Sequence, residues 1–295
     1  MRRDEFGHII EDLSAILRSS EGDEDATGSK YPDLDSILDR HPGVTLETLL
    51  SIYSQHGIRR FRAFMKRSLY DSQYELTRRY MRGEGAVKIS RSIDTPPIVV
   101  VRQLVTWLCF DDEKKPEISR CIKEPPRLLT LPTSARLEAM APRDAQHLKL
   151  RLVADLEHCA AVDPLCSPYA DTLRHSIGVE YEELLQRRLH GAGVPFRTED
   201  DLRAEGRAKT PDVWFDVPIG VNGKVVNWID SKASFCDDEA YIGKDEEQFK
   251  GYVNRYGSGM VIYWFGLIDD LNAHPQIYLV DQFPAAGDIL QLACI

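Results

Sequence analysis

The sequence predicts an α/β domain in the second half of the chain, preceded by an all-α region. Apolar residues spaced three and four apart indicate helices throughout the first half. In the second half, short apolar segments bounded by polar turns indicate strands, which stand among segments of helical periodicity. The expected order in the second half is helix Thr172–His190, strands Val194–Phe196, Asp212–Ile219 and Val225–Ala233, helix Lys244–Tyr256 and strand Met260–Phe265. The 295 residues allow two domains, which we place at residues 1–160 and 166–295.

The N-terminal region begins with an amphipathic helix at Phe6–Leu17 and continues with two helix-turn-helix-like units. We expect N-caps at Thr45 and Thr95, with Pro96 near the first position of the last helix. That last helix is apolar nearly all round and must be mostly buried, so the helix-turn-helix order is weak evidence for DNA recognition. The first unit comprises Leu34–Arg40, a turn at His41–Val44 and Thr45–His56; the second comprises Ala86–Ser92, a turn at Ile93-Asp94 and Ile98–Phe110.

Two N-terminal segments carry opposite charge. Ser19–Asp39 is rich in Ser, Gly, Asp and Glu, which predicts a disordered acidic insert. Ile58–Arg82 contains eight Lys or Arg residues interleaved with Tyr and Phe. A basic helix of this kind can follow a phosphate backbone, and it can equally present a solvated face or dock another protein. Both interpretations stay open; under the first, the candidate nucleic-acid contacts are Arg59, Arg60, Arg62, Lys66 and Arg67.

The helix Thr172–His190 carries an apolar stripe with one carboxylate at its edge. At about 100° per residue, Glu180 falls next to stripe residues, whereas Glu182 and Glu183 point away. A carboxylate that faces inward is costly unless it is paired or bound to metal. We therefore expect Glu180 to be a metal ligand and its two neighbours to be solvated. The stripe consists of Leu173, Ile177, Tyr181, Leu184, Leu185 and Leu189.

Two aspartates and a lysine lie at the ends of two consecutive strands. Thr210-Pro211-Asp212 opens the first strand, and Asp230-Ser231-Lys232 ends the next. Because side chains alternate along a strand, Asp230 and Lys232 share one face. Carboxylates bind hard divalent cations, and a neighbouring ammonium can hold the attacking water. Phosphodiester cleavage depends mostly on positioning and charge neutralisation, so these groups suit it, although each motif alone is also common in ordinary turns.

The pairing of the two strands decides whether these carboxylates can meet. If Asn222-Gly223 is a two-residue hairpin turn, the register sends Asp212 and Asp230 to opposite faces of the sheet. A one-residue bulge or a loop of odd length restores the parity, and Pro218 is a suitable place because it cannot donate to the ladder. We therefore predict an irregularity between Pro218 and Lys224. A regular hairpin without a bulge would count against the site.

Several segments of the second half together resemble a known family. The element order resembles the PD-(D/E)xK nuclease superfamily, and the amino-acid sequence of the segments resembles its TPD branch, the codanin-interacting nucleases. The resemblance covers roughly Cys166–Asp270, with a weaker match at Leu49–Gln55. The matching segments are Gly178–Glu182, Glu199–Arg203, Lys209–Asp212, Asn227–Phe235, Asn254–Gly257 and Val261–Gly266.

The resemblance implies a restriction-endonuclease-like fold with a mixed central sheet, and a nuclease that uses Mg²⁺ or Mn²⁺. Lys232 would position the nucleophilic water, and Gln248 would support water or phosphate from the following helix. Asp230 stands where many relatives carry the longer Glu. The implied metal ligands are Glu180, Asp212, Asp230 and the backbone carbonyl of Ser231.

Composition indicates an intracellular protein. No apolar run approaches the ~20 residues of a membrane span, and the N-terminus lacks the apolar core of a signal peptide. The six cysteines are scattered without zinc-like spacing, so we expect reduced thiols. The net charge of −10 argues mildly against a general nucleic-acid binder. Together with the resemblance, these features lead us to expect a protein of the nucleus and cytoplasm.

The leading functional hypothesis is a divalent-metal nuclease that hydrolyses DNA, with branched or flapped structures as candidates and RNA left open. The alternative is an interaction protein that keeps the nuclease fold mainly to bind a codanin-like scaffold. The set of inward carboxylates beside Lys232 favours the nuclease, since a pure scaffold does not need it. The net negative charge of the chain and the partner implied by the resemblance keep the alternative open. A helix-turn-helix regulator ranks last because it leaves the carboxylates unexplained.

Overall fold

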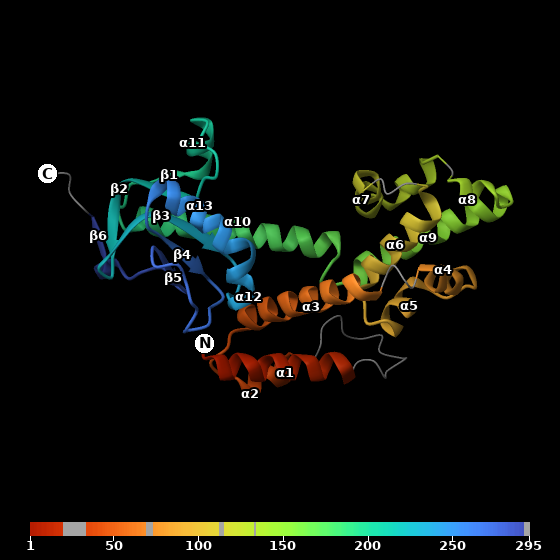
Figure 1. Cartoon of the computed structure of the whole chain (residues 1–295), viewed down its shortest axis with the longest axis horizontal. Coiled ribbons are helices and arrows are strands. Elements are labelled where there is room, and N and C mark those ends of the chain that lie inside the picture. Colours follow the sequence, from red (N-terminus) through yellow and green to blue (C-terminus); the bar gives the residue numbers. More distant parts are fainter. Residues whose placement is uncertain (20–33, 69–72, 112–114, 133, 292–295) are drawn as a thin grey trace. The chain divides into compact units, whose positions relative to one another are not determined.

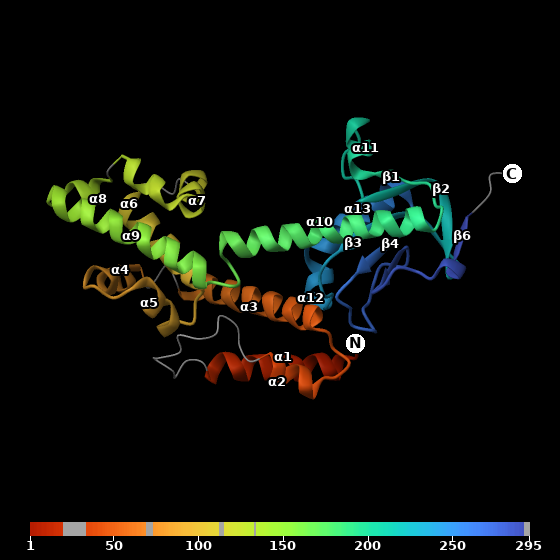
Figure 2. The same ribbon diagram turned by 180° about the vertical axis from the view of Figure 1, so that it is seen from behind.

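The computed structural model describes residues 1–19, 34–68, 73–111, 115–132 and 134–291, shown from two sides in Figures 1 and 2. The chain forms two compact units. The first contains Met1–Asp12, Asp35–Ile52 and His175–Ile295, and the second contains Leu13–Leu34 and Tyr53–Arg174. Relative to the expected domains, two segments of the first 52 residues, Met1–Asp12 and Asp35–Ile52, therefore belong with the sheet. The predicted acidic insert lies largely outside the described residues.

The first unit is built on a mixed sheet, so the predicted α/β class is confirmed. The order is β1-β2-β3-β4-β5, and β6 pairs with the other end of β2. Pairs involving β2 are antiparallel, whereas β3–β4 and β4–β5 are parallel. The strands are β1 (Arg197–Thr198), β2 (Val213–Val221), β3 (Lys224–Lys232), β4 (Gly259–Tyr263), β5 (Ile277–Val280) and β6 (Ile289–Gln291).

Helices cover both faces of this sheet. On one face, α10 (Pro168–Gly191) buries Leu185 and Leu189 against apolar side chains of β2, β3 and β4. On the other, α13 (Glu246–Tyr256) buries Phe249 and Tyr252 against Trp228 and its neighbours. Short helices α11 (Glu199–Ala204) and α12 (Asp238–Ala240) lie between the strands along the chain. The three-layer arrangement leaves the ends of β2 and β3 between α10 and α13.

The first strand of the expected order was misplaced. Residues 194–196 are not a strand, and β1 follows at Arg197–Thr198. The reason is local: Thr198 and Asp201 form a capping box that starts α11, so the chain pairs with β2 only briefly before it turns into a helix. The later strands and α13 lie within a few residues of their predicted positions.

An irregularity in the β2–β3 pairing brings the two aspartates together. Val213 faces Ile229, but beyond Trp214 the register shifts, so that β2 accommodates three extra residues before Ile219. The hairpin turn itself is tight, with positive φ at Asn222 and Gly223. The irregularity therefore lies in residues 215–218 and ends at Pro218, rather than lying between Pro218 and Lys224 as predicted. Because three is odd, the register places Asp212 opposite Asp230 on one face of the sheet.

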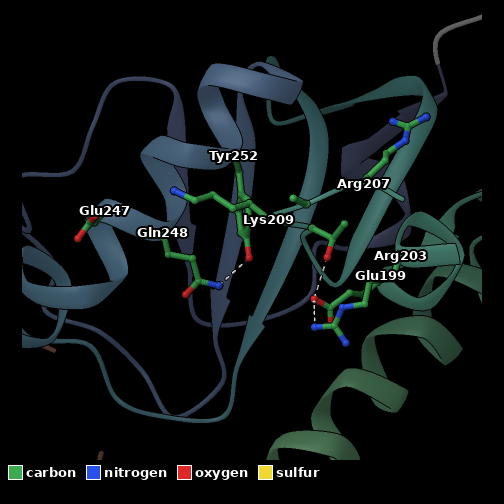
Figure 3. A pocket seen from close by; sticks show the side chains of 9 residues that line it. Glu199, Arg203, Arg207, Lys209, Glu247, Gln248 and Tyr252 are labelled. Atoms are coloured by element: carbon green, nitrogen blue, oxygen red, sulfur yellow. Dashed lines mark hydrogen bonds and ion pairs between the residues drawn. The ribbon is translucent and has the colours of Figure 1, made fainter. Parts of the chain in front are cut away.

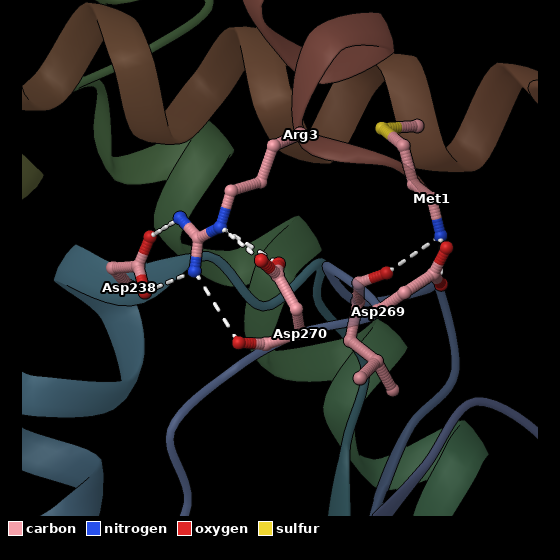
Figure 4. A network of polar contacts seen from close by, with 6 residues as sticks. Met1, Arg3, Asp238, Asp269 and Asp270 are labelled. Atoms are coloured by element: carbon pink, nitrogen blue, oxygen red, sulfur yellow. Dashed lines mark hydrogen bonds and ion pairs between the residues drawn. The ribbon is translucent and has the colours of Figure 1, made fainter.

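The N-terminal segment is fastened to the sheet unit by charge and by ring stacking. The guanidinium of Arg3, on α1 (Arg3–Ser19), binds the carboxylates of Asp238 and Asp270 (Figure 4). Phe6 stacks on Phe235 with ring centroids 5.5 Å apart. The Phe235 backbone N–H donates to the Ser51 hydroxyl at 2.8 Å. These contacts explain why the first residues belong to the unit that carries the sheet.

The remaining helices follow the predicted all-α pattern. Thr45 caps α3 as expected, since its hydroxyl accepts from the Thr48 N–H at 3.2 Å. Thr95 does not cap α6, because the N-cap position is occupied by Pro96, whose side chain has no acceptor; the Ile98 N–H donates instead to the buried carboxylate of Asp163. These helices are α2 (Asp35–Arg40), α3 (Leu46–Ser68), α4 (Gln73–Met81), α5 (Ala86–Ser92), α6 (Pro97–Cys109), α7 (Lys115–Lys123), α8 (Ala135–Glu138) and α9 (Pro142–Val162).

The second unit has a separate apolar core centred on α6. Nine of the thirteen α6 residues are buried, as the apolar sequence predicted, and they pack with α9 and the short helices around it. Among the helices whose residues are described, none combines the length and the apolar composition needed to cross a bilayer.

Candidate functional site

The predicted pair of aspartates and the lysine meet at the end of β3. Asp230 is 1% exposed, and its Oδ1 lies 2.8 Å from the Lys232 ammonium. Apart from this ion pair, Asp230 Oδ1 has no hydrogen-bond partner among the residues that the structure describes. Asp212 is half-buried, and its Oδ2 accepts the Ser231 N–H at 2.7 Å. One backbone donor and one ammonium thus hold two carboxylates on the same face of the sheet.

Burial and neighbouring charges shift the pKa values of Asp212 and Lys232. Burial and the neighbouring Asp230 charge raise the pKa of Asp212 well above its usual value of 3.8, and the Ser231 hydrogen bond only partly offsets them. Burial alone would lower the pKa of Lys232, but the Asp230 carboxylate outweighs it and the net pKa is raised. Lys232 therefore remains an ammonium at neutral pH. It can stabilise negative charge or hold a water molecule, but it cannot act as the base.

A short relay fixes the position of Lys232. Its Nζ donates to Gln248 Oε1 at 3.3 Å, and Gln248 Nε2 donates to the Tyr252 hydroxyl at 2.6 Å. Gln248 and Tyr252 lie four residues apart on α13, which puts both on the face turned towards β3. The structure places Gln248 beside Lys232, and its predicted role toward water or phosphate stays a prediction; Tyr252 was not among the predicted residues. The spacing of four residues between Gln248 and Tyr252 was the sequence signal that could have indicated Tyr252.

On α10, the structure reverses the expected roles of two glutamates. Glu180 is exposed, whereas Glu182 is half-buried and its pKa is raised by burial and by the charges of Glu199 and Asp230. The prediction that Glu180 points inward was wrong, because only the second half of α10 packs on the sheet. Relative to the buried Leu189, Glu182 lies about 20° away around the helix and Glu180 about 180°.

The donors present suit a divalent cation. Asp212, Asp230 and Glu182 place negative charge in one partly buried region, and among the described residues the cation paired directly with this charge is Lys232. A hard cation would relieve this mutual repulsion. In the described ranges, no three His, Cys, Asp or Glu side chains are already gathered at ligand distances. The Ser231 hydroxyl accepts from Trp264 Nε1 at 2.8 Å, and a metal contact by the Ser231 carbonyl stays a prediction.

A cavity of about 430 Å³ adjoins this cluster (Figure 3). It shares Gln248 and Tyr252 with the relay, and its other wall comes from α11 and the loop before Asp212. The loop wall is basic, a feature that was not among the sequence predictions. The lining residues are Glu199, Arg203, Arg207, Ala208, Lys209, Thr210, Glu247, Gln248 and Tyr252.

The basic segment Ile58–Arg82 is not one continuous helix, because α3 ends at Ser68 and α4 begins at Gln73. Arg59 donates to Gln55 at 3.2 Å, Arg60 forms an ion pair with Asp94, and Arg62 is exposed. The side chains of Lys66 and Arg67 lie outside the described residues. Two of the five candidate contacts are therefore engaged within the second unit, and their role in nucleic-acid binding stays a prediction.

The fold and the site define an α/β protein whose mixed sheet presents buried carboxylates and a fixed lysine at one end. A family model described as "Protein of unknown function TPD sequence-motif" matches residues 148–283. The CDAN1-interacting nuclease 1 of Danio rerio is 33% identical over 247 residues, covering 80% of this chain and 77% of the relative. The chain belongs to the CDAN1-interacting nuclease family, which confirms the resemblance.

Other relatives agree. The protein of the same name from Xenopus tropicalis is 31% identical over 263 residues, covering 84% of this chain and 80% of the relative. That of Mus musculus is 30% identical over 270 residues, with coverages of 88% and 90%. No solved structure matches the chain. The family is thus nuclease-related by the names of its members, and the chemistry must be argued from the site.

Proposed function

We propose that the chain is a divalent-metal-dependent nuclease that hydrolyses phosphodiester bonds of DNA, on a restriction-endonuclease-like core. The observation that carries the proposal is the three-residue irregularity in β2. It sets Asp212 opposite Asp230, beside Lys232, although a regular hairpin would separate them. A fold that brings two carboxylates together against their repulsion, at one buried sheet end, has the character of a functional site rather than a structural one.

In the proposed site, Asp212, Asp230 and Glu182 hold Mg²⁺ or Mn²⁺, with the Ser231 carbonyl as a further donor. When bound, the cation supplies charge neutralisation at the phosphate and a water of lowered pKa. The Ser231 N–H holds Oδ2 of Asp212, so that Asp212 would offer its other oxygen to the cation. Lys232 stays cationic, aligns the attacking water and stabilises charge on the phosphate. Gln248 and Tyr252 hold the lysine in place.

Cleavage of labelled single-stranded, duplex, flap and four-way DNA with Mg²⁺ or Mn²⁺ tests the proposal. Asp212→Asn and Lys232→Ala should each lower the rate by at least ~10²-fold, the scale for loss of one electrostatic contributor. Asp216→Asn is a matched control, because Asp216 lies on the same strand but is 68% exposed. Full activity in both site variants would remove this cluster from the chemistry.

A second pair of variants tests the choice of glutamate. Glu182→Gln should reduce cleavage strongly, because Glu182 is the half-buried glutamate of α10 and its pKa is raised by burial and by the charges of Glu199 and Asp230. Glu180→Gln should leave the rate close to that of the parent, because Glu180 is exposed on the opposite side of α10. The reverse pattern would restore Glu180 as the ligand.

The names of the relatives also describe proteins that interact with CDAN1. We propose the same interaction as a second role of this chain, with a codanin-like scaffold as the partner and the nucleus and cytoplasm as its location. Titration of the purified scaffold with the parent and with Asp212→Asn separates the two roles. Equal affinity of the two proteins would show that scaffold binding does not need the carboxylate cluster.

A further inference from the structure

The cavity beside the carboxylate cluster has one cation that nothing in the described part of the chain neutralises. Arg203 forms an ion pair with Glu199 at 2.7 Å. Arg207 pairs with Glu205 at 3.1 Å, and its guanidinium lies 4.7 Å from the centre of the Trp214 ring. The Lys209 ammonium has no ion pair and no hydrogen bond with any described residue.

The backbone that presents Lys209 is held in an unfavourable conformation. Lys209 has φ 54°, a left-handed value that is uncommon for a residue other than Gly or Asn. Its side chain extends across the cavity towards α13 (Figure 3), where a Cβ added to Gly251 would lie 3.4 Å from its Cδ. Arg255, also on α13, donates to the carbonyl of Ala208. The loop is thus fixed against the helix that carries Gln248.

We propose that Lys209 binds the backbone phosphate of the nucleotide next to the one cleaved, in the cavity between its loop and α13. The inference rests on the proposed function, because Lys209 lies three residues before Asp212 and the cavity shares Gln248 with the Lys232 relay. A nucleic-acid strand carries one phosphate per nucleotide, so a substrate placed at the carboxylates brings a neighbouring phosphate within the same region. The size of the cavity, about 430 Å³, falls within the range of small-ligand pockets.

The acidic groups of the cavity do not remove this positive site. Glu199 is engaged twice, by Arg203 and by the Thr210 hydroxyl, which donates to it at 2.9 Å. Glu247 lies on the α13 side, and Figure 3 shows its carboxylate pointing away from Lys209. A phosphate bound at Lys209 would therefore meet the ammonium without an adjacent unpaired carboxylate on the loop side.

The experiment measures binding rather than turnover, so that it is independent of catalysis. The parent is full-length Asp212→Asn protein in EDTA, and the probe is a fluorescently labelled 20-nucleotide DNA strand followed by anisotropy. Lys209→Asn removes the charge with a residue that tolerates left-handed φ, so the loop is retained. Lys209→Arg keeps the charge. Lys250→Gln is the matched control, because Lys250 lies on α13 outside the cavity and pairs with Glu246 at 2.8 Å.

Lys209→Asn should weaken binding roughly five- to tenfold at about 0.1 M salt, as expected for one charge-assisted phosphate contact. It should also lower the slope of log affinity against log salt by about 0.7. Lys209→Arg and Lys250→Gln should both match the parent. An affinity and a salt slope unchanged by Lys209→Asn would overturn the assignment, as would a parent that binds no DNA. Weakened binding in a protein that does not cleave would sustain Lys209 and remove only the proposed catalysis.

Discussion

Gly259, the first residue of β4, lies against the face of the Trp228 ring, and this contact fixes how closely β3 and β4 can pack. A Cβ added at Gly259 would lie 2.0, 2.2 and 2.5 Å from three ring atoms, whereas ordinary van der Waals contact begins at 3.4 Å. The ring cannot withdraw freely. It is fully buried, its Nε1 donates to the Gly257 carbonyl at 2.9 Å, and the ring of Tyr252 packs on it at 5.2 Å.

We expect Gly259→Ala to destabilise the sheet unit by about 3 kcal/mol. Overpacking a filled core costs about 1–3 kcal/mol. Displacement of the Trp228 ring would weaken its hydrogen bond, which is worth about 1 kcal/mol more. For a domain of this size, each kcal/mol lowers Tm by about 2–4 °C, so the expected shift is about 6–12 °C downward.

Thermal unfolding followed by tryptophan fluorescence is the suitable assay, because three of the four tryptophans lie in the sheet unit. Gly178→Ala is the matched control: no atom lies within 4 Å of its added Cβ, and alanine is favoured within a helix by about 0.5–1 kcal/mol. It should raise Tm slightly. A Gly259→Ala protein that unfolds within about 2 °C of the parent would refute the packing described for β3 and β4.

Three further predictions concern the site and the second unit. Tyr252→Phe should leave the fold intact but loosen Gln248, lowering cleavage about tenfold with KM unchanged; a change in KM alone would argue against a positioning role. Asp163→Ala should cost the second unit about 3 kcal/mol in calorimetric unfolding, because three backbone N–H groups lose their acceptor, whereas Asp171→Ala, at an exposed site, should cost little. In EDTA, Asp212→Asn should raise Tm increasingly as pH rises from about 4 to 8. Because the pKa of Asp212 is raised on folding, its contribution to stability is present below pH 3.8 and is lost as the pH rises. Asn has no such pH dependence and keeps an acceptor for the Ser231 N–H. A Tm difference independent of pH would contradict this.

The sequence carried the α/β order, the two aspartates and Lys232, because these depend on local periodicity and on the alternation of side chains along a strand. As predicted from the alternation of side chains, a hairpin with a two-residue turn required an odd number of extra residues to bring the aspartates together, and β2 contains three of them. Their position was not predictable from Pro218 alone. The pairing is regular from the tight turn back to Ile219, so the extra residues lie before Ile219, in the part of β2 where Asp216 is exposed.

The choice between Glu180 and Glu182 could not be made from the helical wheel alone. Leu173 extended the apolar stripe in the sequence, yet it is 58% exposed, so the stripe did not coincide with the buried face. Which half of α10 packs on the sheet is a tertiary property. Likewise, the acceptor for the start of α6 is Asp163, far along the chain, and no local pattern around Thr95 indicates it.

The claim that Glu182, Asp212 and Asp230 form one divalent-cation site is tested most directly by titration calorimetry with Mn²⁺ in the absence of nucleic acid. We expect binding by the parent and by Glu180→Gln, weaker binding by Glu182→Gln, and none by Asp212→Asn. No Mn²⁺ binding by the parent, or binding that depends on Glu180 rather than Glu182, would contradict it.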